Sequence, residues 1–154
     1  MAMSNADKSD PLQVLTEKEY RVLKGAVERI VPETERPPNL DLALKIDQVL
    51  AICRKELTRD LKLLLFLLEY GTPILGFKFK RFTQMSPEEK DRYLSSWERS
   101  AFPFKRTGFQ ALKRSALAAF YGSEESWSGI GYRGPWLTRG YPHGYEGKGI
   151  QVPG

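Results

Sequence analysis

The stretch Leu61-Lys62-Leu63-Leu64-Leu65-Phe66-Leu67-Leu68 carries an apolar residue at every position but one. At helical spacing, these side chains cover nearly every side of one helix. A helix that is apolar all round is usually surrounded by protein, so we expect this segment to form the central helix of the fold. Gly71 and Pro73 are typical of helix ends and predict its C-terminus.

Another apolar pattern precedes this segment and begins at about Asp41. Its members recur every three or four positions, which predicts an amphipathic helix with its apolar face in the core. Cys53 is the only cysteine, so no intrachain disulfide, CxxC pair or zinc ribbon can form. We interpret it as a small buried hydrophobic residue. The apolar face consists of Leu42, Ile46, Val49, Leu50, Cys53 and Leu57.

The first helix of the chain is predicted from its start signal. Thr16 and Glu19 form the pattern of a capping box, and Leu15 can pack against Tyr20 as a hydrophobic staple. Pro32 ends the pattern. Residues 1–14, which precede the cap, are predicted to be a mobile lead. The apolar positions of this helix are Tyr20, Leu23, Val27, Ile30 and Val31.

Two further helices follow the leucine-rich segment. Ser86 is a cap residue followed by Pro87 and two acidic residues, which is typical of a helix start. Pro103 separates this helix from the next one, which Gly122 closes. Residues 77–82 lie between the leucine-rich helix and the helix that starts at Ser86. Their phenylalanines and basic residues alternate with period two, and the pattern leaves open whether they form an extended edge or an irregular connector. The apolar positions of the two helices are Tyr93, Leu94, Trp97, Phe109, Leu112, Ala116, Leu117, Phe120 and Tyr121.

The sequence therefore predicts an all-α protein, a small bundle of about five helices formed by residues 15–122, followed by an extended, irregular arm over residues 123–154. The arm contains eight glycines and three prolines among its aromatic residues, so we expect neither helix nor strand in it. It either wraps a partner or folds back over its own helices, and we favour the partner because Tyr and Trp concentrate in interfaces. The predicted partner-binding residues are Trp127, Tyr132, Trp136, Tyr141, His143 and Tyr145.

The positive net charge of the chain is compatible with a second function, nucleic-acid binding. The chain has 24 Lys and Arg against 19 Asp and Glu, a net charge of +5. A basic helical protein that binds nucleic acid is therefore an alternative. Lys78, Lys80 and Arg81 alternate with phenylalanines, as in surfaces that stack single strands. We prefer an amphipathic connector whose phenylalanines pack inward, and expect no nucleic-acid partner.

Signatures of catalysis and of cofactor binding are weak. Residues 129–134 match GxGxxG, but no buried strand precedes them and Pro135 follows, so a dinucleotide fold does not fit. His143 is the only histidine, which rules out a His-rich metal site and makes a Ser-His-Asp relay improbable. We expect no catalytic residue, no metal and no cofactor bound by this chain.

Targeting signals are also absent from the sequence given. Residues 1–12 are polar and lack the basic and apolar regions of a secretory signal. The longest apolar run, Leu63 to Leu68, is far shorter than the roughly 20 residues that span a bilayer. We expect a cytoplasmic protein without a membrane span. A periplasmic location, by co-export with a partner or after removal of a signal, is the alternative.

Local patterns over residues 15–136 resemble the gluconate 2-dehydrogenase subunit 3 family, the small subunits of bacterial membrane-associated gluconate and glucose dehydrogenases. A similar pattern precedes the flavin domain of long-chain alcohol oxidases. The shared residues are Leu15-Thr16, Ile30-Val31-Pro32, Phe82-Thr83-Gln84-Met85-Ser86-Pro87-Glu88-Glu89, Arg92, Leu94, Trp97, Ser100, Arg106, Phe109, Ala111-Leu112-Lys113, Tyr121, Trp127, Ile130-Gly131-Tyr132 and Gly134-Pro135.

The resemblance implies a hetero-oligomer. The partner would be a large flavoprotein of the glucose-methanol-choline type, which holds FAD and the catalytic base and acts on an alcohol, sugar or sterol. This chain would assist its folding, stability or export without catalysis. Many relatives begin with a twin-arginine export signal, which residues 1–15 lack. A cytochrome subunit is not implied.

Overall fold

The computed structural model describes residues 12–74 and 80–135, and of residues 72–74 the backbone alone. These residues form an all-α fold without strands, which confirms the predicted fold class. Two short 3₁₀ turns, η1 and η2, connect the helices. The elements are α1 (Glu17–Ile30), η1 (Glu33–Glu35), α2 (Leu42–Ile52), α3 (Lys55–Ile74), η2 (Phe82–Gln84), α4 (Pro87–Glu98), α5 (Pro103–Gly122) and α6 (Glu124–Trp127).

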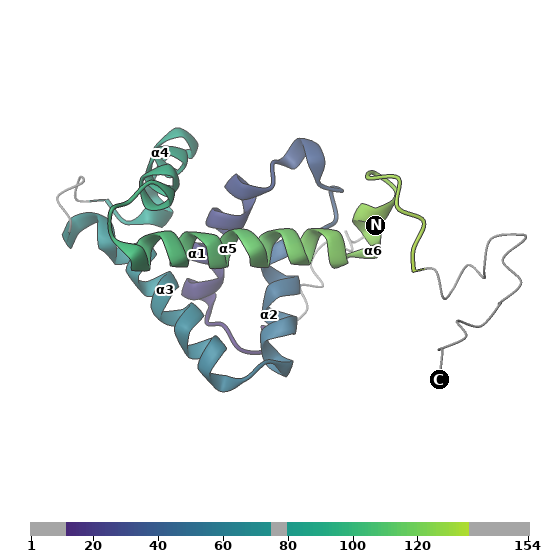
Figure 1. Cartoon of the computed structure of the whole chain (residues 1–154), viewed down its shortest axis with the longest axis horizontal. Coiled ribbons are helices and arrows are strands. Elements are labelled where there is room, and N and C mark those ends of the chain that lie inside the picture. Colours follow the sequence, from purple (N-terminus) through teal and green to yellow (C-terminus); the bar gives the residue numbers. More distant parts are fainter. Residues whose placement is uncertain (1–11, 75–79, 136–154) are drawn as a thin grey trace, which may run out of the picture.

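The central helix is α1 and not the leucine-rich α3. α1 packs against α2, α3, α4 and α5, and its residues Val22, Leu23, Ala26 and Val27 are buried. α2 and α3 form a V that is joined at the bottom of Figure 1, and α5 crosses in front of α1. The helix that contacts every other long helix is thus the first one in the sequence.

Prediction and structure differ on α3 because only one of its faces meets the rest of the protein. Leu61, Leu65 and Leu68 are buried and repeat at steps of four and three, as expected for one stripe. Leu63 is 57% exposed and Phe66 is 56% exposed. The excess of apolar residues on α3 therefore lies on the surface.

The C-terminus of α3 was also predicted wrongly, because the helix continues through Gly71 and Pro73 to Ile74. Pro73 lies in the last turn, where the missing N–H costs one hydrogen bond, to the carbonyl of Glu69. Gly71 does not end the helix but allows α3 to pack closely against α4. A β-carbon at Gly71 would lie 3.1 Å from the hydroxyl of Tyr93 on α4.

The predicted helix starts are confirmed. At α1, the side chain of Glu19 accepts from the backbone N–H of Thr16 at 2.8 Å, and Thr16 Oγ1 accepts from that of Glu19 at 3.3 Å. Ser86 and Glu89 form the same capping box at α4, with Pro87 in the first turn. Asp41 caps α2 by accepting from the N–H of Leu44 at 3.0 Å.

The stripe predicted for α2 is only partly in the core. Ile46 and Leu50 are buried, whereas Val49 is more than half exposed. α2 ends at Ile52, so Cys53 is its C-cap and is half-buried instead of buried. Leu57 belongs to α3 and is exposed. The break at Cys53 turns the chain, so the two halves of the predicted stripe no longer share one face.

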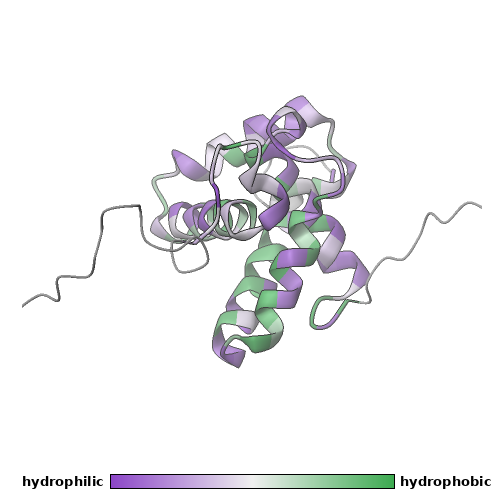
Figure 2. Ribbon diagram, turned by 90° about the vertical axis from the view of Figure 1, so that its right-hand side faces the viewer, coloured by the Kyte–Doolittle hydropathy of each residue, from purple (hydrophilic) through white to green (hydrophobic). Residues whose placement is uncertain are grey.

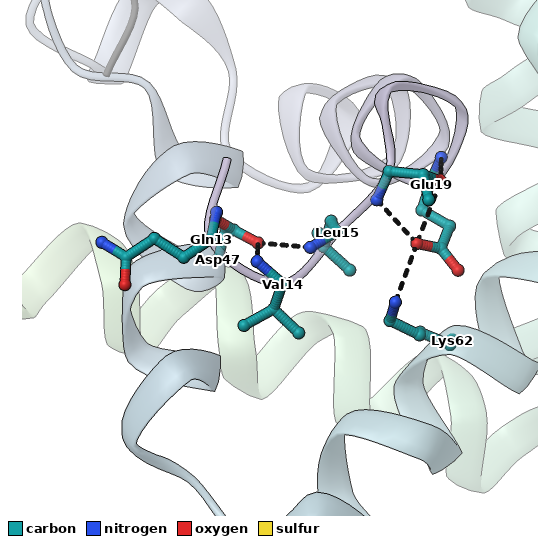
Figure 3. A network of polar contacts seen from close by, with 7 residues as sticks. Gln13, Val14, Leu15, Glu19, Asp47 and Lys62 are labelled. Atoms are coloured by element: carbon teal, nitrogen blue, oxygen red, sulfur yellow. Dashed lines mark hydrogen bonds and ion pairs between the residues drawn. The ribbon is translucent and has the colours of Figure 1, made fainter. Parts of the chain in front are cut away.

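A buried carboxylate attaches the segment before α1 to α2 (Figure 3). Asp47 accepts from the backbone N–H groups of Gln13 at 2.6 Å, Val14 at 3.1 Å and Leu15 at 2.7 Å. Charged side chains are buried only when their hydrogen bonds are satisfied. Gln13 and Val14, the end of the predicted lead, are thereby held against α2.

The structure describes part of the connector before α4. Phe82, at the start of η2, is completely buried and lies beside Tyr93 with ring centroids 5.9 Å apart. Its inward packing agrees with the amphipathic connector. Residues 77–79 of the alternating stretch, and Lys78 with them, lie outside the described residues.

Candidate partner interface

An apolar groove of about 740 Å³ lies between α2, α3 and α5. Hydrophobic residues are concentrated on the helices at the bottom of Figure 2, where α2 and α3 meet. Exposed apolar surfaces that are this continuous usually mark interaction sites. The groove is lined by Ile46, Val49, Leu50, Cys53, Leu57, Asp60, Leu61, Leu63, Leu64, Leu67, Pro103, Phe104, Thr107, Gly108, Ala111, Ser115, Ala118 and Ala119.

The floor of the groove is formed by small residues of α5. Gly108, Ala111, Ser115 and Ala118 are spaced three or four positions apart and so lie along one side of the helix. A β-carbon at Gly108 would lie 2.5 Å from Leu64 Cδ1. The missing side chain at Gly108 therefore lets the side chain of Leu64 on α3 reach the backbone of α5.

The walls of the groove carry large exposed hydrophobic side chains. Val49 on α2, Leu57 and Leu63 on α3, and Phe104 on α5 line the groove, and each is more than half exposed. Ile52, at the end of α2, is 87% exposed beside them. Complete burial of a fully exposed side chain of this size contributes roughly 1.5–3 kcal/mol, so each of the four wall residues, already nearly half buried, would gain about half of that.

Positive charge accompanies the groove. α5 has Lys105, Arg106, Lys113 and Arg114 and no acidic residue between Pro103 and Gly122. Three of them have contacts within the chain. Lys113 Nζ lies 3.8 Å from Glu98 Oε1, Arg106 Nη1 donates to the carbonyl of Ser100 at 2.6 Å, and Lys105 Nζ lies 5.9 Å from the Trp97 ring centroid.

The other basic groups at the groove are more exposed. Arg114 is exposed and lies three positions from Ala111 and four from Ala118, so it is on the groove side of α5. Arg54 and Lys55 are exposed at the junction of α2 and α3. Exposed basic side chains therefore lie at the α2–α3 junction and along the α5 edge of this apolar surface.

The start of the predicted arm is folded. A one-turn helix, α6, occupies Glu124–Trp127, where no helix was expected. Ser126 explains it, because its buried hydroxyl donates to the carbonyls of Phe120 and Ser123 and fixes the turn to the end of α5. After it, Gly131 and Gly134 have φ values of 70° and 91°, which favour glycine.

Two of the predicted partner-binding residues lie together. The rings of Trp127 and Tyr132 meet edge to face with centroids 5.1 Å apart. Trp127 is half-buried, and its Nε1–H donates to the carbonyl of Tyr121 at 2.9 Å. Over this stretch the chain folds back on α5. The remaining predicted residues lie outside the described part of the chain: Trp136, Tyr141, His143 and Tyr145.

Polar and charged groups at the N-terminus of α2 link it to α1. Tyr20 donates to Asp41 at 2.5 Å, and Lys24 Nζ lies 2.9 Å from the same carboxylate. Burial acts to raise the pKa of Asp41, but hydrogen bonds from Tyr20, Lys24 and the N–H of Leu44 outweigh it and lower that pKa. Partial burial and the hydrogen bond to Asp41 raise the pKa of Tyr20.

The described residues contain no group of three His, Cys, Asp or Glu side chains that could hold a metal ion. In residues 12–74 and 80–135, no helix is long and apolar enough to cross a membrane. The glycine motif at 129–134 follows the helix α6 and not a strand.

The groove was missed at the sequence level because its walls were assigned to the core. The spacing of Val49 and Leu57 fits a single apolar stripe, and Leu63 belongs to a segment that was predicted to be buried on all sides, so all three were expected in the core. A signal was present in the small residues of α5. Gly108, Ala111, Ser115 and Ala118 repeat like a packing face, but no further helix within residues 12–74 and 80–135 covers them.

Comparison with known families gives a match over most of the described residues. The family model described as gluconate 2-dehydrogenase subunit 3 matches residues 17–134, from the start of α1 to the glycine turn after α6. The match includes α2, α3 and α5, the three helices of the groove. No curated protein matches the chain, and no solved structure does.

Proposed function

We propose, from the premise that the chain belongs to the gluconate 2-dehydrogenase subunit 3 family, that it is a non-catalytic accessory subunit of a heteromeric FAD-dependent alcohol, sugar or sterol oxidoreductase. Its partner in this proposal is a large flavoprotein of the glucose-methanol-choline type. FAD and the catalytic base belong to that partner. This chain stabilises the partner and contributes no group to the reaction.

The observation that carries the proposal is the apolar groove between α2, α3 and α5. It exposes Val49, Leu57, Leu63 and Phe104 together, although the same helices bury their other apolar faces efficiently. Burial of apolar surface is the main favourable term in protein association. A subunit whose role is to bind another protein has a reason to keep such a surface.

Stabilisation follows from linkage. A subunit that binds only the folded flavoprotein stabilises it by RT ln(1 + [L]/Kd), about 2.7 kcal/mol when its free concentration is a hundred times Kd. Folded domains are stable by only about 5–15 kcal/mol. That increment decides whether a marginally stable flavoprotein retains its fold and its cofactor.

The alternative, a nucleic-acid-binding protein, is supported by the basic character of α5. Three of its four basic side chains, however, have contacts within the chain: Lys105, Arg106 and Lys113. The groove beside them is apolar, whereas nucleic-acid interfaces are polar and strongly charged. Nucleic-acid binding predicts an affinity that falls steeply with salt, and a flat response dismisses it.

Co-expression with a large flavoprotein of the glucose-methanol-choline type from the same host tests the proposal. We expect the tagged chain to co-purify a large subunit whose absorption spectrum shows oxidised flavin and which has dehydrogenase activity. The chain expressed alone should be colourless and inactive with any sugar or alcohol. Stoichiometric FAD in the purified single chain, or failure of any flavoprotein to bind it, contradicts the proposal.

A further inference from the structure

We propose that the groove between α2, α3 and α5 binds one amphipathic α-helix of the flavoprotein subunit, with acidic residues beside its apolar face. This inference rests on the proposed function and specifies the part of the partner that this surface recognises. The backbone chemistry of the groove, its length and its charge specify this occupant.

The occupant is a helix because the groove offers no backbone partners. Its walls are side chains of three helices, whose own N–H and C=O groups are, away from the helix ends, already paired within those helices. An extended peptide in this apolar setting would leave its own backbone groups unsatisfied, at about 1–3 kcal/mol each. A helix satisfies these groups internally and presents only side chains.

Groove length fits a short helix. The floor runs along α5 from Phe104 to Ala119, which at 1.5 Å per residue is about 22 Å, or roughly four turns. The small side chains of Gly108, Ala111 and Ala118 permit close approach of a second helix, near the 8 Å end of the usual 8–10 Å separation. Val49 and Leu63 then contact its two flanks.

Charge specifies the polar face of the occupant. Arg114 is exposed beside Ala111 and Ala118, and Arg54 and Lys55 are exposed where α2 meets α3. α5 has no acidic residue. On α3, Asp60 lines the groove, but it lies 3.8 Å from the exposed Arg59. Acidic side chains next to the apolar stripe of the partner helix complement this edge, and opposite charges across an interface favour association and register.

Two other occupants fit less well. Residues 136–154 contain five glycines and two prolines, which disfavour a helix, and they carry Arg139 and Lys148 against Glu146. A second copy of the chain would bring its own basic α5 against this one. Like charges across an interface oppose both arrangements.

Photocrosslinking of the full chain in its complex identifies the occupant. A benzophenone amino acid at Ala111, on the groove floor, is compared with the same amino acid at Ala51, which is exposed on α2 but does not line the groove. We expect Ala111 alone to crosslink to one segment of the large subunit. That segment should have apolar residues at i, i+3, i+4 and i+7 flanked by Asp or Glu.

Substitutions measure the contribution of the groove. Ala118→Glu places a charge on the exposed floor, where it can pair with Arg114 four residues earlier, so the helix itself is not weakened. We expect the complex to bind at least about tenfold more weakly, because the charge is desolvated beside an acidic helix. Ala51→Glu is the matched control and should leave the affinity unchanged.

A charge reversal tests the acidic partner. Arg114→Glu should weaken binding by about tenfold at low salt and less at high salt, whereas Arg21→Glu, exposed on α1 and away from the groove, should have no effect. Melting of each isolated variant, followed by circular dichroism, should match that of the unmodified chain. A loss of affinity then reports on the interface.

Failure of this inference is distinguishable from failure of the proposed function. If the flavoprotein complex forms but Ala111 crosslinks to residues 136–154, to a second copy or to no segment, the groove is not the site of a partner helix and the accessory role stands. Unchanged affinity of Ala118→Glu leads to the same conclusion. If no flavoprotein binds the unmodified chain, both are wrong.

Discussion

Oδ1 of Asp47 on α2 accepts a hydrogen bond of 2.7 Å from the backbone N–H of Leu15, just before α1, although the two residues are 32 positions apart. The same carboxylate also binds the N–H groups of Gln13 and Val14. It is completely buried. One side chain thus satisfies three backbone donors at the entry to the central helix.

Asp47→Ala should lower the free energy of unfolding by about 2–4 kcal/mol, because buried backbone donors lose their acceptor. Urea denaturation of the isolated chain measures this loss. Asp60→Ala is the control, since Asp60 is exposed and its nearest basic partner is Arg59 at 3.8 Å. It should change stability by less than about 0.5 kcal/mol. Equal effects of the two substitutions would contradict the role assigned to Asp47.

Gly108→Ala should separate folding from binding. The new methyl group collides with Leu64 Cδ1, the flexible end of a side chain, so a rotamer change costing about 0.5–1.5 kcal/mol is offset by the helix propensity of alanine. Stability should change by less than about 1 kcal/mol. Displaced Leu64 alters the groove and should weaken flavoprotein binding. Gly122→Ala, which meets open space, is the control, and a matching loss of affinity there would argue against the groove.

Tyr93 makes the fold sensitive to alkaline pH. Its buried hydroxyl donates to the carbonyl of Leu68 at 3.2 Å, and burial raises the pKa of Tyr93 to about 12. Below pH 10 the hydroxyl is protonated in both folded and unfolded states. Between pH 10 and 12 only the unfolded state loses the proton, so stability falls as pH rises.

The expected loss is at most about 2–3 kcal/mol between pH 9.5 and 12, from 1.36 kcal/mol per pKa unit. Urea denaturation of the native chain and of Tyr93→Phe over this range measures it. The phenylalanine variant should lose less stability as pH rises, whatever its stability at neutral pH. Parallel pH profiles for the two proteins would show that Tyr93 is not responsible.

Trp127 should contribute to the stability of the isolated chain. It is half-buried against Tyr132 and donates to the carbonyl of Tyr121, so Trp127→Ala should cost on the order of 1–2 kcal/mol. Thermal melting of the isolated variant is the measurement. Tyr121→Ala provides a comparison, because it removes an exposed ring but keeps the accepting carbonyl. An unchanged melting temperature for Trp127→Ala would leave a role in partner binding as its main one.

The rest of the arm should matter for the partner and not for the fold. Truncation after Pro135 keeps all six helices of the described part, so the melting temperature should change little. Affinity for the flavoprotein should fall, and Trp136→Ala, if it is an anchor, should account for about 2–4 kcal/mol of that loss. Reduced stability with unchanged affinity would assign residues 136–154 to the helical domain.

The sequence predicted those features of the fold that depend on interactions between residues close together in the chain. The caps at Thr16 and Ser86 need only four consecutive residues, and both formed as expected. The end of α3 was predicted wrongly because Gly71 is needed for close packing against Tyr93 on α4 and does not end the helix. No pattern within residues 61–74 contains that information.

The candidate interface was harder to predict for the same reason. An apolar residue such as Leu63 gives the same sequence pattern whether its side chain is covered by its own chain or by a partner. Only the arrangement of helices shows that α1 covers one side of α3 and that another side of α3 stays open. The predicted aromatic arm, by contrast, was judged by composition, which did not reveal the folded turn that Ser126 stabilises.

The central position of α1 has a consequence for synthesis on the ribosome. This helix emerges first, yet it is covered by α5, which begins only at Pro103. Until α5 has left the exit tunnel, Leu23 and Val27 have no complete set of neighbours, and the future core is exposed. The groove, whose floor is α5, forms only afterwards and stays exposed until the partner binds. Contacts between distant segments form slowly, and such incompletely packed chains are prone to aggregate. Translation alongside the partner subunit would shorten the time for which the completed groove is exposed, so the gene order of the two subunits and their relative rates of synthesis become part of how the protein reaches its native state.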